Sequence, residues 1–322
     1  MRRLLPILVS VLFLSLENSF SQEGLPFLTE VEIDGRYSNS RIGSIIQDGE
    51  ETMFFSTSRG VLKFDGSTWE LITTPSPATE VFYHQASNRI FVALKNGAAE
   101  ILQSDSGTYK VQAIPGVSAN RPVNRIINEG TEVYFIGDDV FYALNPLKDE
   151  DARTFEFEDR MINGAFVFRQ NLFLIFYQEG LFTWSNNELV SVGKHEKVTD
   201  DQMLFSFQTN NGTYVGFDHD VLFLFNGNSF KPVRPQLEKF LNENLLSDGL
   251  LLNDSLMALS TLAGGAIIVN TDSQTIKHRF DYATGVKDNE IFCLGKDGDE
   301  GLWLAFESGL SRVDINQPVK SF

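Results

Sequence analysis

The sequence predicts an all-β fold, a single seven-bladed β-propeller built from four-stranded antiparallel blades. The first observation is a degenerate repeat of about 40 residues that occurs seven times, most clearly over 40–66 and 288–315. The second is the character of each copy, which reads as short apolar strands separated by polar turns. The third is a glycine or aspartate before the third strand of every copy: Gly60, Gly97, Asp139, Gly180, Asp220, Gly265 and Gly309. A repeat of this kind is typical of propeller blades.

The repeats place seven blades in order along a single domain over residues 22–322. The predicted boundaries are 40–74, 79–114, 122–158, 161–192, 201–234, 247–280 and 288–322. Within a blade, a run such as 53–55 or 302–304 has the length and apolar character of a strand buried on both faces. The glycine or aspartate that follows is expected to have a positive φ, which a two-residue hairpin turn requires. The chain has 28 phenylalanines, and their flat side chains are expected to fill the space between neighbouring sheets.

Two segments depart from the repeat. Residues 235–246 carry Leu237, Phe240 and Leu241 on one helical face, which predicts an amphipathic helix on the loop between blades five and six. Residues 27–33 alternate in the manner of a strand before the first repeat. A closed ring must protect the edges of its first and last blades, so this strand is expected to pair with blade seven.

Residues 1–21 have the pattern of a signal peptide. A short basic region precedes a mainly apolar stretch over 4–16, and Ser19 and Ser21 supply the small residues of a cleavage site. The apolar stretch is too short to cross a membrane, and no other segment has the roughly 18 apolar residues that a span needs. We therefore expect the mature chain to be exported, to the periplasm or the medium, without a membrane span.

The net charge excludes one class of partner. The formal charge is −17, and a surface this acidic repels a phosphate backbone, so no nucleic acid partner is expected. The single cysteine, Cys293, lies in an apolar run. It is interpreted as a small core residue, and a reactive thiol is the alternative.

The best copies of the repeat resemble a known family. Residues 289–314 run from an apolar strand through an aspartate turn to a strand with Trp303, then to a glycine and a strand that ends in Asp314. Residues 42–65 follow the same order with Phe54 at the tryptophan position. This pattern is similar to the two-component regulator propeller repeat.

The resemblance implies a role in signalling. In that family such propellers form the extracytoplasmic sensor part of bacterial signalling proteins, which usually continue into further blades, an immunoglobulin-like module, a membrane span and a cytoplasmic output domain. It therefore implies that the chain works with a signalling partner or with a C-terminal module outside residues 1–322. No kinase activity is carried over, because no residue of a kinase motif is present.

The sequence contains no catalytic motif, so the chain is expected to be non-enzymatic, without a cofactor or a bound metal. There is no GxSxG, no phosphate-binding loop and no HExxH. The triplet 218–220 (Asp-His-Asp) is interpreted as a tight turn, with a metal site as the weaker alternative. Residues 297–301 are interpreted as a solvated hairpin, with calcium binding as the weaker alternative. Glycan cleavage by two carboxylates stays open as an alternative. The 43 acidic residues form many candidate pairs, and the sequence does not give the distance between the two carboxylates of any pair.

The ligand-binding face is predicted from the geometry of a propeller. Loops that enter the first strands and turns between the second and third strands share one face, around the mouth of the central channel. The predicted face residues are Asn39, Arg41, Arg59, Arg121, Asn124, Arg160, Asn163, Asp201 and Asn289. The same loops and turns also carry Glu80, Lys95, Asp138, Glu179, Gln202, His219 and Asp248.

Three arginines on this face suggest a ligand. Arg41, Arg121 and Arg160 are predicted to converge on an anionic or polyhydroxylated ligand, because a guanidinium offers a rigid set of donors. The alternative is that each arginine is solvated or pairs with a neighbouring carboxylate.

Together these observations predict an extracytoplasmic ligand- or partner-binding sensor propeller of a bacterial signalling system, with an anionic compound or a carbohydrate as the expected ligand. The alternative function is a secreted glycan-active hydrolase or lyase, for which convergent carboxylates at the channel mouth would be the sign. A scaffold for protein contacts is the third hypothesis, and an apolar patch on the outer rim would support it.

Overall fold

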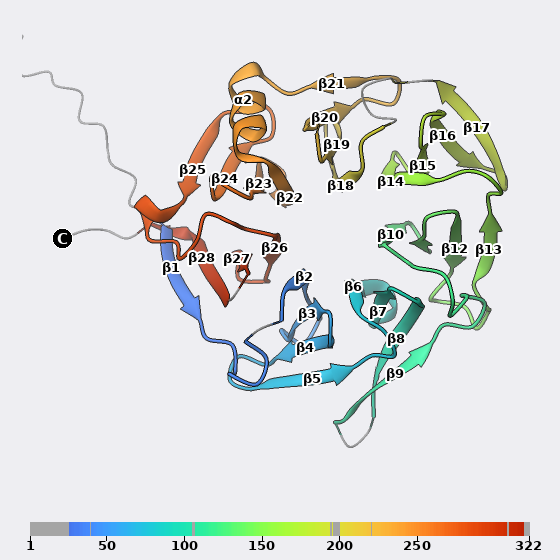
Figure 1. Cartoon of the computed structure of the whole chain (residues 1–322), viewed down its shortest axis with the longest axis horizontal. Helices are drawn as coiled ribbons and strands as arrows, with labels where there is room; N and C mark the ends of the chain where they lie inside the picture. Colours follow the sequence, from blue (N-terminus) through green and yellow to red (C-terminus); the bar gives the residue numbers. More distant parts are fainter. Residues whose placement is uncertain are drawn as a thin grey trace, which may run out of the picture.

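Strands that follow one another in the sequence pair into seven sheets, and the sheets are arranged in a ring (Figure 1). The computed structural model describes residues 26–38, 40–104, 107–193, 195, 200–219, 221–307 and 309–318. Each sheet holds four antiparallel strands, which confirms the seven-bladed propeller predicted from the repeat. The predicted signal peptide lies outside the described residues and stays a prediction.

The first strand of each of the first six blades is innermost, and the fourth is at the rim (Figure 1). Blades one to three contain β2 (Ile42–Gln47), β3 (Met53–Thr57), β4 (Gly60–Phe64) and β5 (Trp69–Thr73); β6 (Ala78–His84), β7 (Arg89–Leu94), β8 (Gly97–Gln103) and β9 (Tyr109–Ala113); and β10 (Arg125–Glu129), β11 (Glu132–Ile136), β12 (Val140–Leu144) and β13 (Arg153–Glu156).

Blades four to six have the same order. They contain β14 (Ile162–Phe168), β15 (Asn171–Phe176), β16 (Gly180–Ser185) and β17 (Glu188–Gly193); β18 (Met203–Thr209), β19 (Gly212–Phe217), β20 (Leu222–Phe225) and β21 (Phe230–Pro232); and β22 (Leu246–Asn253), β23 (Leu256–Thr261), β24 (Ala266–Asn270) and β25 (Ile276–Phe280). Two short 3₁₀ helices, η1 (Gln85–Ser87) and η2 (Tyr282–Thr284), lie in loops.

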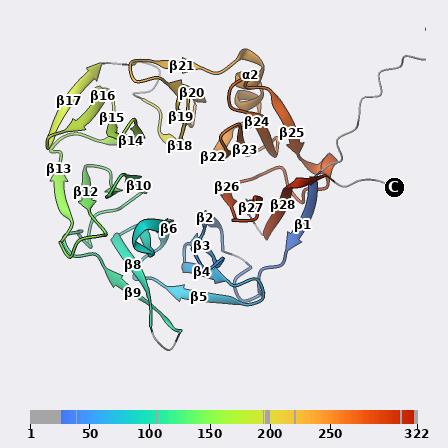
Figure 2. The same ribbon diagram turned by 180° about the vertical axis from the view of Figure 1, so that it is seen from behind.

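Blade seven closes the ring with strands from both ends of the described chain. It contains β26 (Cys293–Lys296), β27 (Gly301–Phe306) and β28 (Gly309–Pro318), and β1 (Pro26–Val31) pairs with β28 as the outermost strand. An ion pair of 2.8 Å between Lys287 Nζ and Glu30 Oε1 adds to this contact. Figure 2 shows the same closure from behind. The predicted pairing of the N-terminal strand with blade seven is therefore confirmed.

Aromatic rings fill the seams between blades, as the high phenylalanine content predicted. Between blades four and five, the ring of Phe225 lies 5.2 Å from that of Phe166, 5.2 Å from that of Phe173 and 4.8 Å from that of Phe230, measured between centroids. The middle strands are buried because a neighbouring sheet covers each face; every residue of β3 and β12 is buried. The rim strand β13 is mostly exposed.

The α-helix of the described chain, α2 (Pro235–Asn244), lies beside blade six (Figure 1). Leu237 and Leu241 are buried in the cluster that joins blades five and six. The guanidinium of Arg279 in β25 lies 4.6 Å from the ring centroid of Phe240. The helix begins where predicted and ends two residues earlier, because Leu246 already belongs to β22. No helix in the described ranges has both the length and the apolar character needed to cross a membrane.

Two structural features explain the glycine before the third strand. Gly60 and Gly265 have φ values of 132° and 77°, which disfavour other residues. A Cβ atom at these positions would also lie 2.3 Å from the Ile72 carbonyl oxygen and 2.0 Å from that of Phe280, both on the rim strands. The expectation of a positive φ is wrong for Asp139, which is not among the residues with one.

Candidate functional site

The innermost strands of the blades surround a central channel (Figures 1 and 2). A cavity of about 530 Å³ occupies the channel and is lined mainly by β2, β6, β18, β22 and β26. Asn124 and Arg125, at the start of β10, complete the wall. We call this space the channel cavity.

Five of the seven innermost strands have a bulge near their start. The pairing register shifts between Ile42 and Ser44, Ala78 and Glu80, Ile162 and Gly164, Met203 and Phe205, and Leu246 and Asp248. Bulges redirect side chains at the ends of strands. The equivalent residues around the ring are Ser44, Glu80, Arg125, Gly164, Phe205, Asp248 and Cys293.

Three of the side chains at this position connect their blade to the next. In blade one, Ser44 Oγ accepts a hydrogen bond of 2.8 Å from the backbone N–H of Val81 in blade two. In blade two, Glu80 Oε2 makes the same contact and accepts 2.7 Å from the N–H of Ile126 in blade three. Ser44 shows that a neutral hydroxyl is sufficient for this structural role.

Asp248 makes the equivalent contact between blades six and seven. Its Oδ2 accepts a hydrogen bond of 2.8 Å from the N–H of Leu294, and its Oδ1 accepts one of 2.8 Å from the N–H of Gly249. Burial raises the pKa of Asp248 to about 6, against the opposing effects of these two hydrogen bonds and of the charge on Arg125. At pH values just below neutral, a fraction of the molecules therefore carries a protonated Asp248.

Burial also raises the pKa of Glu80, and the charge of Asp248 adds to the increase, while Arg125 and the hydrogen bond from Ile126 oppose it. Protein surrounds both carboxyl groups, yet each keeps some accessible surface toward the channel. The two groups come from blades two and six and are close enough for their charges to interact.

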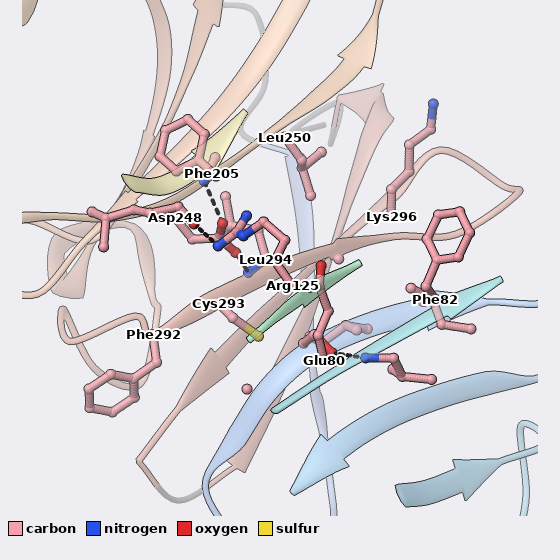
Figure 3. A pocket seen from close by; sticks show the side chains of 18 of the residues that line it. Glu80, Phe82, Arg125, Phe205, Asp248, Leu250, Phe292, Cys293, Leu294 and Lys296 are labelled. Carbon is pink, nitrogen blue, oxygen red and sulfur yellow. Dashed lines mark hydrogen bonds between the residues drawn. The ribbon is translucent and has the colours of Figure 1, made fainter. Parts of the chain in front are cut away.

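Arg125 crosses the channel. Its Nη2 donates a hydrogen bond to the backbone carbonyl of Leu204 in blade five. Blade four lies between blades three and five and has Gly164 at the equivalent position. Within the described residues no carboxylate oxygen lies within 4.0 Å of the guanidinium, although its charge acts on both Glu80 and Asp248. Figure 3 shows the three side chains in the wall of the channel cavity.

A second cavity, of about 370 Å³, opens beside the channel at the predicted binding face and shares Asn124 and Arg125 with the channel cavity. We call it the mouth cavity. Its other polar side chains are Asp138, Asn163, Asp200, Gln202 and Asp218. Met161 and Tyr177 supply apolar surface and are 47% and 40% exposed. The two cavities therefore adjoin and share part of their wall.

Two of the predicted face residues line this site, namely Asn124 and Asn163. Asn124 Nδ2 donates a hydrogen bond of 2.6 Å to Asp138 Oδ1, so an entering loop does meet the turn between the second and third strands, as predicted. Arg59 Nη1 instead donates to the Arg36 carbonyl oxygen at 2.9 Å. Asn289 Oδ1 accepts from the N–H of Tyr282 at 3.0 Å. Asn39 lies outside the described residues.

The three predicted arginines have partners near their own positions. The contacts are Arg41 over the ring of Phe292 (3.8 Å), Arg121 with Glu156 (3.3 Å) and Asp139 (3.7 Å), and Arg160 with Glu179 (2.5 Å). Glu156 is on the rim strand of blade three, so Arg121 points toward the rim. None of the three lines the channel or mouth cavity. Their convergence on a ligand stays a prediction.

Asp201, the remaining predicted face residue, belongs to a group that could hold a metal ion. Asp201, Asp218 and His219 each offer a ligand atom, and these atoms lie within 4.8 Å of one another. His219 Nδ1 lies 2.9 Å from Asp218 Oδ1 and 3.6 Å from Asp201 Oδ1. Asp218 and His219 belong to the predicted turn, and Asp201 belongs to an entering loop. Asp220, the third residue of the turn, lies outside the described residues. One imidazole and two carboxylates suit zinc among other ions.

The aspartate turn of blade seven is part of the core. Asp297 is 6% exposed and accepts hydrogen bonds from the Gly301 N–H (2.7 Å), Trp303 Nε1 (2.8 Å) and Arg312 Nε (2.6 Å). Burial raises its pKa, but the hydrogen bonds outweigh burial and hold the pKa below its usual value. The interpretation as a solvated hairpin is wrong for Asp297. Its oxygens are already used by the protein, which removes the central ligand of the calcium alternative.

Cys293 is 3% exposed, and burial raises the pKa of its thiol well above the usual value. A thiol held in its protonated form is a poor nucleophile, so the geometry agrees with the core interpretation.

Sequence reasoning missed Arg125. The signal available was a charged residue directly before the apolar pair Ile126-Ile127 in a strand that had to face the channel.

Solved structures with the same fold include extracellular domains of two-component systems. The extracellular domain assigned to the hybrid two-component system BT4673 of B. thetaiotaomicron is similar over 91% of this chain and 40% of that chain, with a TM-score of 0.70 and 15% identity. The corresponding domain of BT3049 matches over 91% and 42%, with a TM-score of 0.71 and 15% identity. This chain thus spans about two fifths of the length of these structures.

A streptogramin B lyase is also similar, over 90% of this chain and 98% of that chain, with a TM-score of 0.68 and 11% identity. At these identities the likeness shows the fold alone, and that fold agrees with the two-component regulator propeller resemblance. No family model and no curated protein matches the sequence.

Proposed function

We propose that the chain is an extracytoplasmic sensor propeller of a bacterial signalling system that binds a small ligand in the adjoining mouth and channel cavities. The observation that carries the proposal is the set of three charged side chains, Glu80, Arg125 and Asp248, that blades two, three and six contribute to one channel. Ser44 fulfils the blade-to-blade contact with a neutral hydroxyl, so the fold alone does not require charge there.

The same residues connect the proposed ligand site to the contacts between blades. Glu80 connects blades two and three, Arg125 reaches from blade three to blade five, and Asp248 connects blades six and seven. A ligand that binds these groups changes the contacts between several blades at once. A signal follows if the ligand binds one arrangement of the ring more tightly than another. In this role the propeller is not catalytic, and it acts through a signalling partner at its rim.

Ligand screening with the mature chain tests the binding part. Compounds that raise the melting temperature are titrated by calorimetry into the wild type, Arg125→Ala and Arg36→Ala, the last being a matched control because Arg36 is exposed. We expect a hit to bind the wild type and the control with equal affinity and Arg125→Ala with an affinity that differs severalfold or more. Affinity for Arg125→Ala should be lower if the hit offers an acceptor to the guanidinium and higher if the hit is a cation. Equal affinity for all three chains contradicts the proposed site. The reading frame after codon 322 tests the signalling part, for which a membrane span and an output domain are expected.

A secreted lyase or glycan hydrolase is the second candidate function. Glu80 and Asp248 favour it, because two carboxyl groups with raised pKa values face one channel, and such groups can act as acid and base near neutral pH. A streptogramin B lyase has the same fold. Incubation with a glycan panel, followed by measurement of new reducing ends and of unsaturated products, separates the two functions. Turnover that is lost in Glu80→Gln and Asp248→Asn supports the enzyme, and binding without turnover supports the sensor.

A further inference from the structure

The walls of the site carry an excess of negative charge. Five carboxylates line the two cavities, Glu80, Asp138, Asp200, Asp218 and Asp248, together with two basic side chains, Arg125 and Lys296. Lys296 Nζ donates to the Leu252 carbonyl oxygen, and Arg125 Nη2 to that of Leu204, so backbone oxygens hold both cations. The sign of this charge is opposite to the one that suits the anionic ligand predicted from the arginines of the face.

Glu80 and Asp248 make no direct ion pair, and they share the single positive charge of Arg125 at longer range. Neither carboxylate has a lysine or arginine nitrogen within 4.0 Å in the described part of the chain, and Glu80 Oε1 accepts no hydrogen bond there. The backbone N–H groups compensate for only part of the cost of removing a carboxylate from water. A cation that enters the channel cavity supplies the missing charge and gains from the low local dielectric.

The walls of the two cavities also carry apolar side chains. Phe82, Phe205 and Leu250 line the channel cavity (Figure 3), and Met161 and Tyr177 line the mouth. Carboxylates thus occur in both cavities, together with hydrocarbon and ring surface. A volume of about 530 Å³ is far larger than a single ion occupies, and Glu80 and Asp248 come from separate blades rather than from one coordinating loop. This arrangement suits an organic cation more than a metal ion.

We infer that the site binds a small alkylammonium compound, and a diammonium compound best, with one ammonium group against Glu80 and Asp248 in the channel and the second near the carboxylates of the mouth. The inference rests on the proposed sensor function and names the chemical class of its signal. Tyr177 at the mouth adds cation–π attraction for the outer ammonium group. The positive charge of Arg125 limits the affinity, so this residue favours ligands that also offer an acceptor.

Calorimetric titration of the mature chain tests the inference with three compounds of matched length: 1,5-diaminopentane, pentane-1,5-diol and glutarate. We expect only the diamine to bind at pH 7.5. Glu80→Gln and Asp248→Asn should each weaken it by about tenfold or more, whereas Arg125→Gln should strengthen it severalfold. Glu188→Gln, on the rim strand β17, is the matched control and should change nothing. A variant that only damaged the fold would not strengthen binding.

The pH gives an independent readout. Asp248 takes up a proton near pH 6, so affinity for the diamine should fall as the pH is lowered from 7 to 5, and binding near pH 6 should release protons, seen as heats that differ between buffers. Binding of glutarate or of the diol in place of the diamine overturns the inference. So does equal stabilisation by calcium or magnesium chloride, which would indicate a metal site. If the diamine fails while another screened compound binds through Arg125, the sensor function stands and only the ligand class is overturned.

Discussion

The carboxylate of Asp248 and the backbone N–H of Leu294 are joined by a hydrogen bond of 2.8 Å across the seam between blades six and seven. A buried, charged acceptor therefore holds two blades together at the channel. The contact links the stability of the ring to the charge of the proposed ligand site.

The first prediction concerns the pH dependence of stability. Burial raises the pKa of Asp248 from 3.8 in the unfolded chain to about 6, so the folded chain holds this proton more tightly. The resulting stabilisation is complete below about pH 4 and is lost as the pH rises through 6, by no more than about 3 kcal/mol. In Asp248→Asn this dependence should be absent. The free energy of unfolding, measured with denaturant at pH 4, 5, 6 and 7, checks this prediction, with Glu188→Gln as the control. The same dependence of this free energy on pH in the wild type and in Asp248→Asn would contradict the prediction.

The second prediction concerns ring closure. Removal of residues 26–31 exposes the edge of β28 and deletes the outermost strand of blade seven. We expect the melting temperature to fall by more than about 10 °C, because the ring loses a full set of ladder hydrogen bonds. Circular dichroism against temperature measures it. Phe27→Ser, at a side chain that is 53% exposed, keeps the strand and should melt like the wild type; an unchanged melt of the deletion would show that closure lies elsewhere.

The third prediction concerns the aspartate turn. Asp297→Ala should cost about 3–5 kcal/mol, because it leaves Trp303 Nε1 and the Arg312 guanidinium without their buried acceptor. Asp299→Ala, at an exposed position of the same turn, should cost under about 1 kcal/mol. Urea unfolding of both variants gives the comparison. Calcium or a chelator should leave the melting of the wild type unchanged, and a clear shift would restore the calcium alternative.

The fourth prediction concerns the seam between blades four and five. Phe225→Ala should destabilise the chain by about 3–5 kcal/mol, since it opens a cavity among Phe166, Phe173 and Phe230. Phe225→Leu should cost clearly less. Tyr282→Ala, at a ring that is 61% exposed, serves as the surface control. Similar losses for Phe225→Ala and Tyr282→Ala would mean that the seam does not hold the blades together.

The fifth prediction concerns the anionic ligand expected from the sequence. Alanine in place of Arg41, Arg121 and Arg160 together should abolish binding of acidic oligosaccharides, if these arginines form a ligand site. Calorimetry with the triple variant decides the matter. Binding that stays unaltered would mean that the contacts of these residues with Phe292, Glu156 and Glu179 are their whole role.

The fold could be predicted from the sequence because its determinants are local. Gly60 and Gly265 mark their turns through backbone geometry that few other residues adopt, and residues 27–33 show the alternation of an edge strand. The helix was predicted from Leu237 and Leu241, both buried. The end of the helix was not predicted. Leu245 has a positive φ at the start of β22, and the conformational propensity of leucine does not indicate this conformation.

The site could be predicted only in part because its determinants are not local. Asn124 and Asn163 follow from the rule about entering loops, and they do line the mouth. Glu80 and Asp248 were assigned to the same loops, but they lie inside β6 and β22. The bulges that turn them toward the channel and the ring that brings blades two and six together are properties of the assembled fold. Arg125 acts on a carbonyl group that lies 79 residues away in the sequence, and no local pattern indicates that contact.

Strands β1 and β28 carry the two ends of the described chain, and they run antiparallel in the same blade. The register pairs Pro26 with Pro318, so both ends of the described chain leave the blade at the same end of this strand pair. A force that draws the two ends apart therefore loads the ladder one hydrogen bond at a time, beginning at Pro26, over six paired residues. Mechanical tension applied to the chain ends therefore enters the molecule through blade seven. Asp248 joins this blade to blade six at the channel.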